Sequence, residues 1–224
     1  MSGRTRAART RIEDADVAAA DALDHRDHPA VRTLGALSEI ADQVPSFLAC
    51  GSVLAYGLAT GRPRMAEAGG RMLASVLVAT ALKSAVKALV SRTRPHAVLD
   101  GEDYEFEVRG QDGPDHHSFP SGHTAGAVAA ARGLARVYPD AATPAYAVAA
   151  AIALVQIPRA KHYPADLIAG ALVGVVSEWV IAGVLRSKSG REPGAREDRR
   201  FSYDQPHARR RNAHTSAASS VPRG

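Results

Sequence analysis

Apolar and polar positions along this chain form long blocks instead of alternating residue by residue. A weaker alanine-rich run begins at Ala125, and the stronger apolar runs cover residues 46–60, 72–90, 142–157 and 166–185. Several of these runs approach the roughly 20 residues with which a helix crosses a bilayer, and others fall short. The pattern predicts an all-α fold, a multi-helix transmembrane bundle of about five spans. A soluble helical bundle with buried alanine-rich helices is the alternative.

The polar ends frame this bundle. Residues 1–11 are basic, and no apolar stretch follows them in the sequence. We therefore expect a disordered arm instead of a cleavable signal peptide. Residues 12–23 place acids and alanines at helical spacing, and residues 30–42 show a second amphipathic pattern. We therefore expect amphipathic, interfacial helices within residues 12–44, lying at the membrane surface or against the bundle.

Within residues 45–186 we expect the helical domain itself. Pro45 opens the first apolar helix, and a long second helix is predicted from about residue 65 to residue 92, ended by Arg94 and Pro95. A polar, acidic loop over residues 97–117 follows. Further helices are predicted over 122–137 and 142–157, and Pro164 suits the first turn of a last helix that runs to about residue 186.

Charge is unevenly distributed. The formal net charge is +5, but residues 186–224 hold ten Lys or Arg against four Asp or Glu, a net +6 that leaves −1 for the rest. We expect residues 187–224 to form a basic disordered tail. The mean hydropathy of −0.15 is low because both polar ends are averaged with the apolar middle. The single cysteine, Cys50, excludes an internal disulfide and fits a small buried hydrophobic residue.

Basic residues flank alternate turns of the predicted bundle. By the positive-inside rule, these turns and the basic tail belong in the cytoplasm: Arg62, Arg64, Arg71, Arg132, Arg136. The acidic loop and the connection near His162 then fall on the outer side. This topology places the arginine-containing amino-terminal arm outside as well, which is its weakest point. We expect an integral membrane protein of a bacterial inner (plasma) membrane.

The sequence Pro120-Ser121-Gly122-His123 stands directly before an alanine-rich helix. Ser121 is a good N-cap, and Gly122 has no Cβ, so an anion can approach the backbone. The first amides of such a helix lack internal partners and favour negative charge. His123 adds a group that can carry a proton near neutral pH. This segment predicts a phosphate site beside a proton donor, or, alternatively, a simple cap with a surface histidine.

Two further segments carry matching chemistry. Lys87 and Arg94 are seven residues apart, two turns of the predicted second helix, so both would project from one side near its end and could bind one phosphate. Lys83, one turn before Lys87, either joins them or extends its ammonium to the membrane surface. Asp166 follows His162 by four residues, so its carboxylate could accept one imidazole proton and orient the other nitrogen as a nucleophile.

Taken together, the three segments resemble the signature of the phosphatidic acid phosphatase type 2 superfamily. That signature reads Lys-x6-Arg-Pro, then Pro-Ser-Gly-His, then Ser-Arg-x5-His-x3-Asp. The first two parts are complete here, and the third is complete only in His162 and Asp166. Gln156 stands where the family has arginine, and Arg159 is the expected substitute phosphate ligand, with a neutral hydrogen bond from Gln156 as the alternative.

The resemblance implies a site and a mechanism. His162 would attack phosphorus to form a phosphohistidine, supported by Asp166, and His123 would protonate the leaving oxygen. The phosphate would be held by Lys87, Arg94, Ser121, Gly122 and Arg159. It implies no cofactor and no metal, a lipid phosphate substrate, the bilayer as partner and no nucleic acid.

The function expected from this resemblance is a metal-independent membrane phosphatase acting on a lipid phosphate or diphosphate monoester. The candidate substrates are phosphatidic acid, phosphatidylglycerol phosphate and a polyprenyl phosphate or diphosphate. Alternatives are a phosphotransferase on the same site, a vanadium-dependent haloperoxidase of the same superfamily, and a non-catalytic membrane protein that binds anionic lipid. The active site would lie on the outer face and the basic tail in the cytoplasm, with the oligomeric state open.

Overall fold

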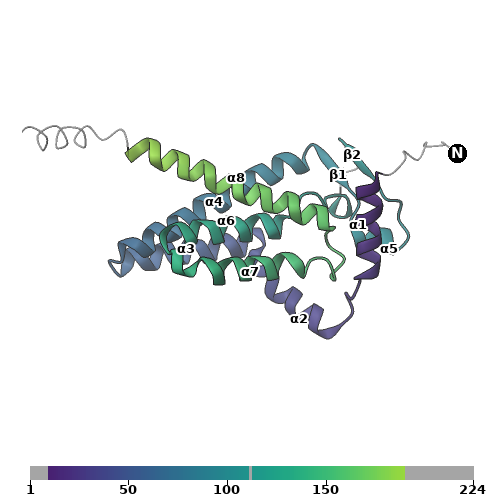
Figure 1. The fold of residues 1–224 in the computed structure, drawn as a ribbon, viewed down its shortest axis with the longest axis horizontal. Helices are drawn as coiled ribbons and strands as arrows, with labels where there is room; N and C mark the ends of the chain where they lie inside the picture. The colour runs from purple at the N-terminus through teal and green to yellow at the C-terminus, as the bar shows by residue number, and fades with distance from the viewer. Residues whose placement is uncertain (1–9, 111–112, 190–224) are drawn as a thin grey trace, which may run out of the picture. The chain divides into compact units, whose positions relative to one another are not determined.

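The computed structural model describes residues 10–110 and 113–189 (Figure 1). The described helices and strands, in chain order, are α1 (Arg11–Ala22), α2 (Pro29–Ser38), η1 (Glu39–Ala41), α3 (Gln43–Ala59), α4 (Pro63–Lys87), β1 (Val90–Arg92), α5 (Pro95–Leu99), β2 (Phe106–Val108), η2 (Pro114–His116), α6 (Gly122–Val137), η3 (Pro139–Ala141), α7 (Ala142–Leu154) and α8 (Pro164–Ser189). Residues 185–224 form a separate unit, of which only the end of α8 is described.

The predicted arm over residues 1–11 and tail over residues 187–224 lie almost wholly outside the described residues. Arg11, however, is the first residue of α1, so the arm cannot extend that far. The Thr10 hydroxyl accepts a hydrogen bond from the Glu13 amide, and the Glu13 carboxylate accepts one from the Thr10 amide. This capping box fixes the start of α1 at the point where the basic sequence ends.

The chain is an all-α bundle with one small exception, and that exception corrects the predicted second helix. α4 ends at Lys87 instead of Arg92, and residues 90–92 form β1, which pairs antiparallel with β2. The pairing joins Val90 to Val108 and Arg92 to Phe106. Arg94 precedes a proline and is extended, which disfavours a helix through this segment. Lys87 and Arg94 are therefore not two turns apart on one helix.

Two described helices are long and apolar enough to cross a membrane, α4 and α8. α3 is apolar but has 17 residues, and α6 and α7 have 16 and 13. Length and composition thus support two of the about five predicted spans.

Glycines set the close approach of neighbouring helices. A Cβ at Gly57 would lie 2.3 Å from the backbone nitrogen of Ala66, and one at Gly69 would lie 2.3 Å from that of Leu54. α3 and α4 can therefore contact backbone to backbone only because these positions have no side chain. Because only 5% of the residues are aromatic, few large side chains can fill space between the helices, and a dense core requires such close contact.

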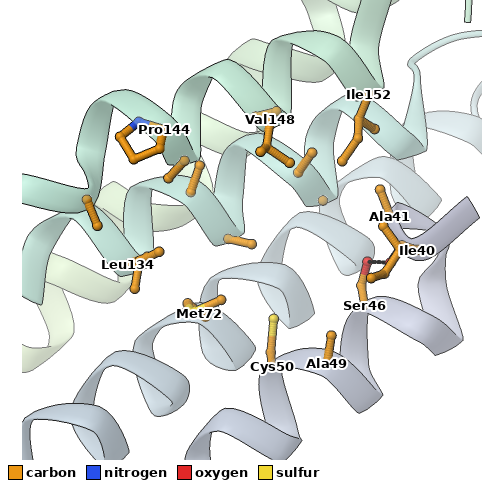
Figure 2. Close-up of a pocket in the computed structure, with 17 residues that line it drawn as sticks. Ile40, Ala41, Ser46, Ala49, Cys50, Met72, Leu134, Pro144, Val148 and Ile152 are labelled. Atoms are coloured by element: carbon orange, nitrogen blue, oxygen red, sulfur yellow. Dashed lines mark hydrogen bonds between the residues drawn. The ribbon is translucent and has the colours of Figure 1, made fainter. Parts of the chain in front are cut away.

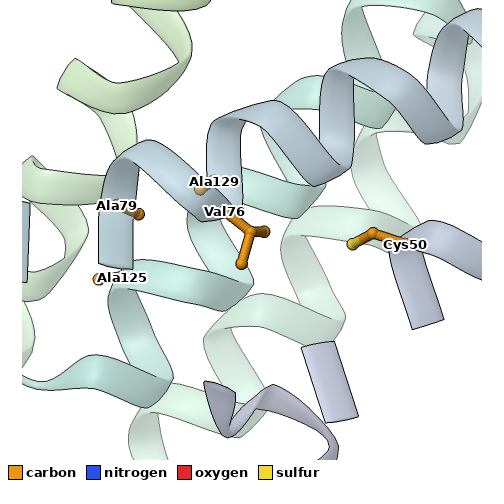
Figure 3. Close-up of a cluster of buried hydrophobic side chains, with 5 residues drawn as sticks. All are labelled: Cys50, Val76, Ala79, Ala125 and Ala129. Carbon is orange, nitrogen blue, oxygen red and sulfur yellow. The ribbon is translucent and has the colours of Figure 1, made fainter. Parts of the chain in front are cut away.

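An apolar groove of about 410 Å³ lies between α3, α4, α6 and α7 (Figure 2). Ile40 and Ala41 of η1 form one side, and Val148 and Ile152 of α7 form another. Beside it, small residues from three helices form a buried core cluster, Cys50, Val76, Ala79, Ala125 and Ala129 (Figure 3). The buried cysteine agrees with its predicted role as a small hydrophobic residue.

α6 and α8 are joined by both charge and close contact. The buried Glu178 carboxylate of α8 accepts hydrogen bonds from Arg132 and Arg136 of α6 at 2.9 to 3.2 Å. Near the other end of α6, a Cβ at Gly170 would lie 2.5 Å from the Ser121 carbonyl. The backbone of α8 therefore rests directly on the start of α6, where the Pro120-Ser121-Gly122-His123 sequence lies.

Candidate active site

One polar cavity of about 330 Å³ brings together residues from distant parts of the chain. Four cations line it, with three carboxylates and three histidines: Lys83, Lys87, Arg94, Lys161, Glu39, Asp42, Asp115, His96, His123, His162. Gly122 and Pro114 complete the lining. The end of α4, the starts of α5 and α6 and the turn before α8 therefore converge on one charged hollow.

Lys87 and Arg94 reach the same cavity although they leave different elements. The Lys87 ammonium donates to the His117 carbonyl at 2.6 Å, and the Arg94 guanidinium donates to the same carbonyl at 3.4 Å. Arg94 also donates to the carbonyls of Pro114 at 2.7 Å and Lys161 at 3.1 Å. Main-chain carbonyls thus hold both cations in place at one wall of the cavity. This arrangement lowers the reorganisation needed to bind an anion.

The start of α6 forms another part of the wall. Ser121 is the N-cap, and its hydroxyl accepts from the Thr124 amide, as the sequence predicts. A Cβ at Gly122 would lie 2.9 Å from the Lys83 ammonium, so this lysine lies directly over the helix N-terminus. The side chain of Ser121 is fully buried and does not line the cavity. Lys83 and Gly122 therefore supply an anion-attracting surface beside His123.

His123 and His162 face each other across the cavity, with ring centroids 6.5 Å apart and ring planes inclined at 61°. The Nδ1 of His162 contacts the Ser118 carbonyl at 2.8 Å, whereas the nearest Asp166 oxygen is 3.7 Å away. Because a carbonyl can only accept, Nδ1 carries the proton, and the other nitrogen keeps a free lone pair. Burial is the main cause that lowers the pKa of His162 to about 4, with Asp166 opposing the shift.

The predicted substitutes for the missing family arginine lie elsewhere. Neither Arg159 nor Gln156 lines the cavity. Arg159 donates to the Glu39 carboxylate at 2.6 Å and to the Ser38 hydroxyl at 3.0 Å, and the buried Gln156 amide also donates to Ser38, at 3.1 Å. Arg159 thus reaches the cavity through Glu39, and its role as a direct phosphate ligand stays a prediction.

Glu39 is a site residue that sequence reasoning missed. Its carboxylate lies 3.3 Å from the His123 Nε2 and 3.3 Å from the Lys161 ammonium, besides its pair with Arg159. No motif includes Glu39, and a single acid in an amphipathic segment gives no signal in the sequence. Lys161 was likewise not predicted, although it directly precedes His162.

Arg92, Asp16 and Ser118 were also missed, and they surround Asp166. The Asp166 carboxylate accepts from the Arg92 guanidinium at 2.6 Å, from the Ser118 hydroxyl at 2.5 Å and from the Tyr163 amide at 2.9 Å. Asp16 contacts Arg92 from the far side. Arg92 lies two residues before Arg94, so its position beside the Lys-x6-Arg-Pro motif could have suggested a role in the site. Nothing in the sequence connects Arg92 with Asp16.

Across residues 10–110 and 113–189, no group of three or more His, Cys, Asp or Glu side chains is arranged to hold a metal ion. The charges placed to meet an anion are instead the amino and guanidinium groups described above.

Comparison with known proteins follows the same segments. The family model described as PAP2 superfamily matches residues 68–188, more than half of the chain, and this range contains all three motifs. A comparison with curated proteins finds no match. Among solved structures, the crystal structure of LpxE from Aquifex aeolicus matches with a TM-score of 0.54 and 17% sequence identity. The match covers 74% of this chain and 93% of LpxE, and at that identity it concerns the fold.

Proposed function

The chain belongs to the PAP2 superfamily, and from that premise we propose that it is a membrane phosphatase that hydrolyses a lipid phosphate or diphosphate monoester through a phosphohistidine intermediate. One observation carries this proposal. The rings of His123 and His162 face each other across a cavity that Lys87 and Arg94 also line. Such a cavity can hold a phosphoryl group with a nucleophile on one side and a proton donor on the other.

In the first step, the unprotonated nitrogen of His162 attacks phosphorus, and the bond from phosphorus to the ester oxygen breaks. His123 gives its proton to the leaving oxygen, which departs as an alcohol, or as a phosphate ester when the substrate is a diphosphate. Lys87, Arg94 and the amides at the start of α6 neutralise the charge on the phosphoryl oxygens. Asp166 keeps its predicted role behind the nucleophile, and Arg159, predicted as a direct phosphate ligand, acts through Glu39 instead.

In the second step, water attacks the phosphohistidine while His123 takes up one of its protons. The bond from phosphorus to nitrogen breaks, inorganic phosphate leaves, and both histidines return to their starting protonation states. Transfer to an alcohol instead of water would make the protein a phosphotransferase on the same site. The product formed in the presence of an alcohol acceptor distinguishes these outcomes.

The apolar groove supports a lipid as the substrate. Glu39 of η1 lines the catalytic cavity, and the next two residues, Ile40 and Ala41, line the groove. Gly126 and Ala127, one turn after His123, also line it. A headgroup phosphate in the cavity would therefore place an apolar chain of the same molecule at the groove, where its burial is favourable.

Two tests follow from this proposal. His123→Ala and His162→Ala should each reduce phosphate release from a panel of lipid phosphates by about 10³-fold or more, as removal of a nucleophile or acid does. Wild-type activity in detergent should be unchanged by EDTA. Retained activity in the folded His162→Ala variant, or loss of wild-type activity in EDTA, would contradict the mechanism. If neither the wild type nor any variant releases phosphate, and anionic lipid still binds, the non-catalytic alternative is favoured.

A further inference from the structure

A buried chain of three charges runs from α1 to the candidate nucleophile. The Asp16 carboxylate of α1 accepts from the Arg92 guanidinium at 2.8 Å, and Arg92 donates to Asp166 at 2.6 Å. All three side chains are almost completely inaccessible to solvent. Such groups interact strongly because water does not screen them.

The same aspartate also contacts the start of α8. Its second oxygen accepts from the Ala165 amide at 3.1 Å, one residue before Asp166. Asp16 therefore fixes the guanidinium that binds Asp166 and the backbone that carries Asp166. The family match begins at residue 68, so this carboxylate comes from outside the matched region.

Three aromatic rings lie around the guanidinium of Arg92. The rings of Tyr163, Tyr104 and Phe106 surround its guanidinium, with centroids at 4.1, 5.5 and 5.4 Å. Burial lowers the pKa of Arg92, but Asp166 and Asp16 outweigh burial and raise it above its ordinary value. Arg92 is thus a permanent cation shared between two carboxylates, and the three groups together carry one net negative charge.

We propose that Asp16 is a positioning residue for His162. Asp16 shares the positive charge of Arg92, so that the negative charge of Asp166 beside the imidazole is only partly neutralised. This inference rests on the proposed function. When His162 attacks phosphorus, its ring gains positive charge, and one net negative charge behind it stabilises that state. Without Asp16, Arg92 would neutralise Asp166 fully.

The other charged and titratable groups that face His162 make this negative charge important. Lys87 and Arg94 are both cationic, and His123 becomes so when it holds a proton. All of them oppose positive charge on the imidazole. Asp166, 3.7 Å from Nδ1, is the only carboxylate among the described residues that the structure places in ion-pair range of this ring. Asp16 acts through it.

The test compares Asp16→Asn with Asp14→Asn, an exposed carboxylate on the same helix. Asp16→Asn keeps the size of the side chain and removes its charge. Its kcat should fall about tenfold with KM within twofold, because the lost interaction acts on the transition state. The acid limb of its kcat/KM profile should move to lower pH. Asp14→Asn should match the wild type, and Asp16→Glu should restore part of the rate.

Thermal unfolding of each variant separates positioning from folding. A purely structural aspartate would lower the Tm of Asp16→Asn but leave the pH profile and the kcat per folded molecule unchanged, and that result would overturn the inference. Wild-type kinetics in Asp16→Asn would overturn it as well. Failure of the proposed function is visible separately, since His162→Ala would then retain activity whatever Asp16→Asn does.

Discussion

The position of Glu39 bears directly on how strongly the cavity can bind an anion. Its carboxylate lies against His123, Lys161 and Arg159, and two of these groups, His123 and Lys161, also line the cavity proposed to hold the phosphate. Burial raises its pKa, but the hydrogen bond from Arg159 and the charges of Lys161 and His123 outweigh burial and lower the pKa to about 2. Glu39 is therefore ionised near neutral pH, and we expect it to compete with a bound anion for His123 and Lys161.

Glu39→Gln should strengthen inhibition by inorganic phosphate. We expect the inhibition constant to fall roughly threefold, a modest change because a half-exposed charge is partly screened by water. Glu102→Gln, which removes an exposed carboxylate from the loop after α5, should leave the inhibition constant unchanged. An unchanged or higher constant in Glu39→Gln would show that the carboxylate does not compete with phosphate.

The sign of the stability effect follows from the same pKa. A carboxylate whose folded-state pKa lies below its ordinary 4.5 stabilises the fold above pH 4.5, and this stabilisation is lost as the pH falls towards 2. Glu39→Gln should consequently lower the Tm at pH 7, and the difference from the wild type should shrink on acidification below pH 4.5. A Tm difference independent of pH over that range would contradict the ion pairs.

At the residue scale, the sequence predicted the groups that lie in motifs and missed those that support them. His123, His162, Lys87 and Arg94 were predicted because fixed spacings connect them, and the structure brings all four to one cavity. Asp16 is 76 residues from Arg92 in the chain, and only the folded state joins them. A contact of that kind leaves no local pattern in a single sequence.

At the scale of elements, the predicted helices were largely right, but only some of their ends were. α6 begins at Gly122 and ends at Val137 as predicted, because a serine cap and a following proline mark both limits. α4 was predicted five residues too long, because the apolar run continues into β1 and its periodicity cannot separate a helix end from a short strand.

The contact between α6 and α8 sets the distance between the two histidines. Gly170 and Gly174 are one turn apart on α8, and a Cβ there would lie 2.5 Å from the Ser121 carbonyl and 2.7 Å from the Ala125 carbonyl. These neighbours are backbone atoms and cannot rotate away. α8 would have to move off α6, and His162, just before α8, would move with it.

Gly170→Ala and Gly174→Ala should each lower stability by about 1–3 kcal/mol, the usual cost of overpacking, and should reduce kcat by about tenfold or more. Gly183→Ala provides a control on the same helix, since a Cβ there meets nothing within 4 Å. That variant should match the wild type or be slightly more stable, because alanine favours the helix. Equal activity in all three variants would show that the approach of α8 does not position His162.

For the molecule as a whole, the arginines of α4 and α6 are separated from the cavity. The cavity gathers the end of α4 and the start of α6. At the other ends of these two helices, the Arg64 guanidinium of α4 donates to the Val137 carbonyl of α6 at 2.8 Å. Arg136, the residue before Val137, binds Glu178 of α8. The arginines of α4 and α6 therefore lie away from the cavity, whereas two lysines of α4, Lys83 and Lys87, line it. Under the positive-inside rule, the position of these arginines favours a cytoplasmic location for that end of the bundle, and the outer-face site stays a prediction.

Cysteine labelling tests that orientation directly. In a Cys50→Ala background, which replaces a buried thiol with a small apolar side chain, Glu102→Cys would mark the cavity side and Thr60→Cys the arginine side. Both positions are exposed. A membrane-impermeant maleimide added to intact spheroplasts should label the first variant, and should label the second only after the membrane is opened. The reverse pattern would place the site in the cytoplasm, and labelling of both in intact spheroplasts would mean that the bundle does not span the membrane.

The expected pattern also identifies the crossing segment. A protected Thr60→Cys together with an accessible Glu102→Cys requires that the chain crosses the bilayer between these two positions. α4 runs from the arginine side to the cavity side between them, and it is long enough to cross.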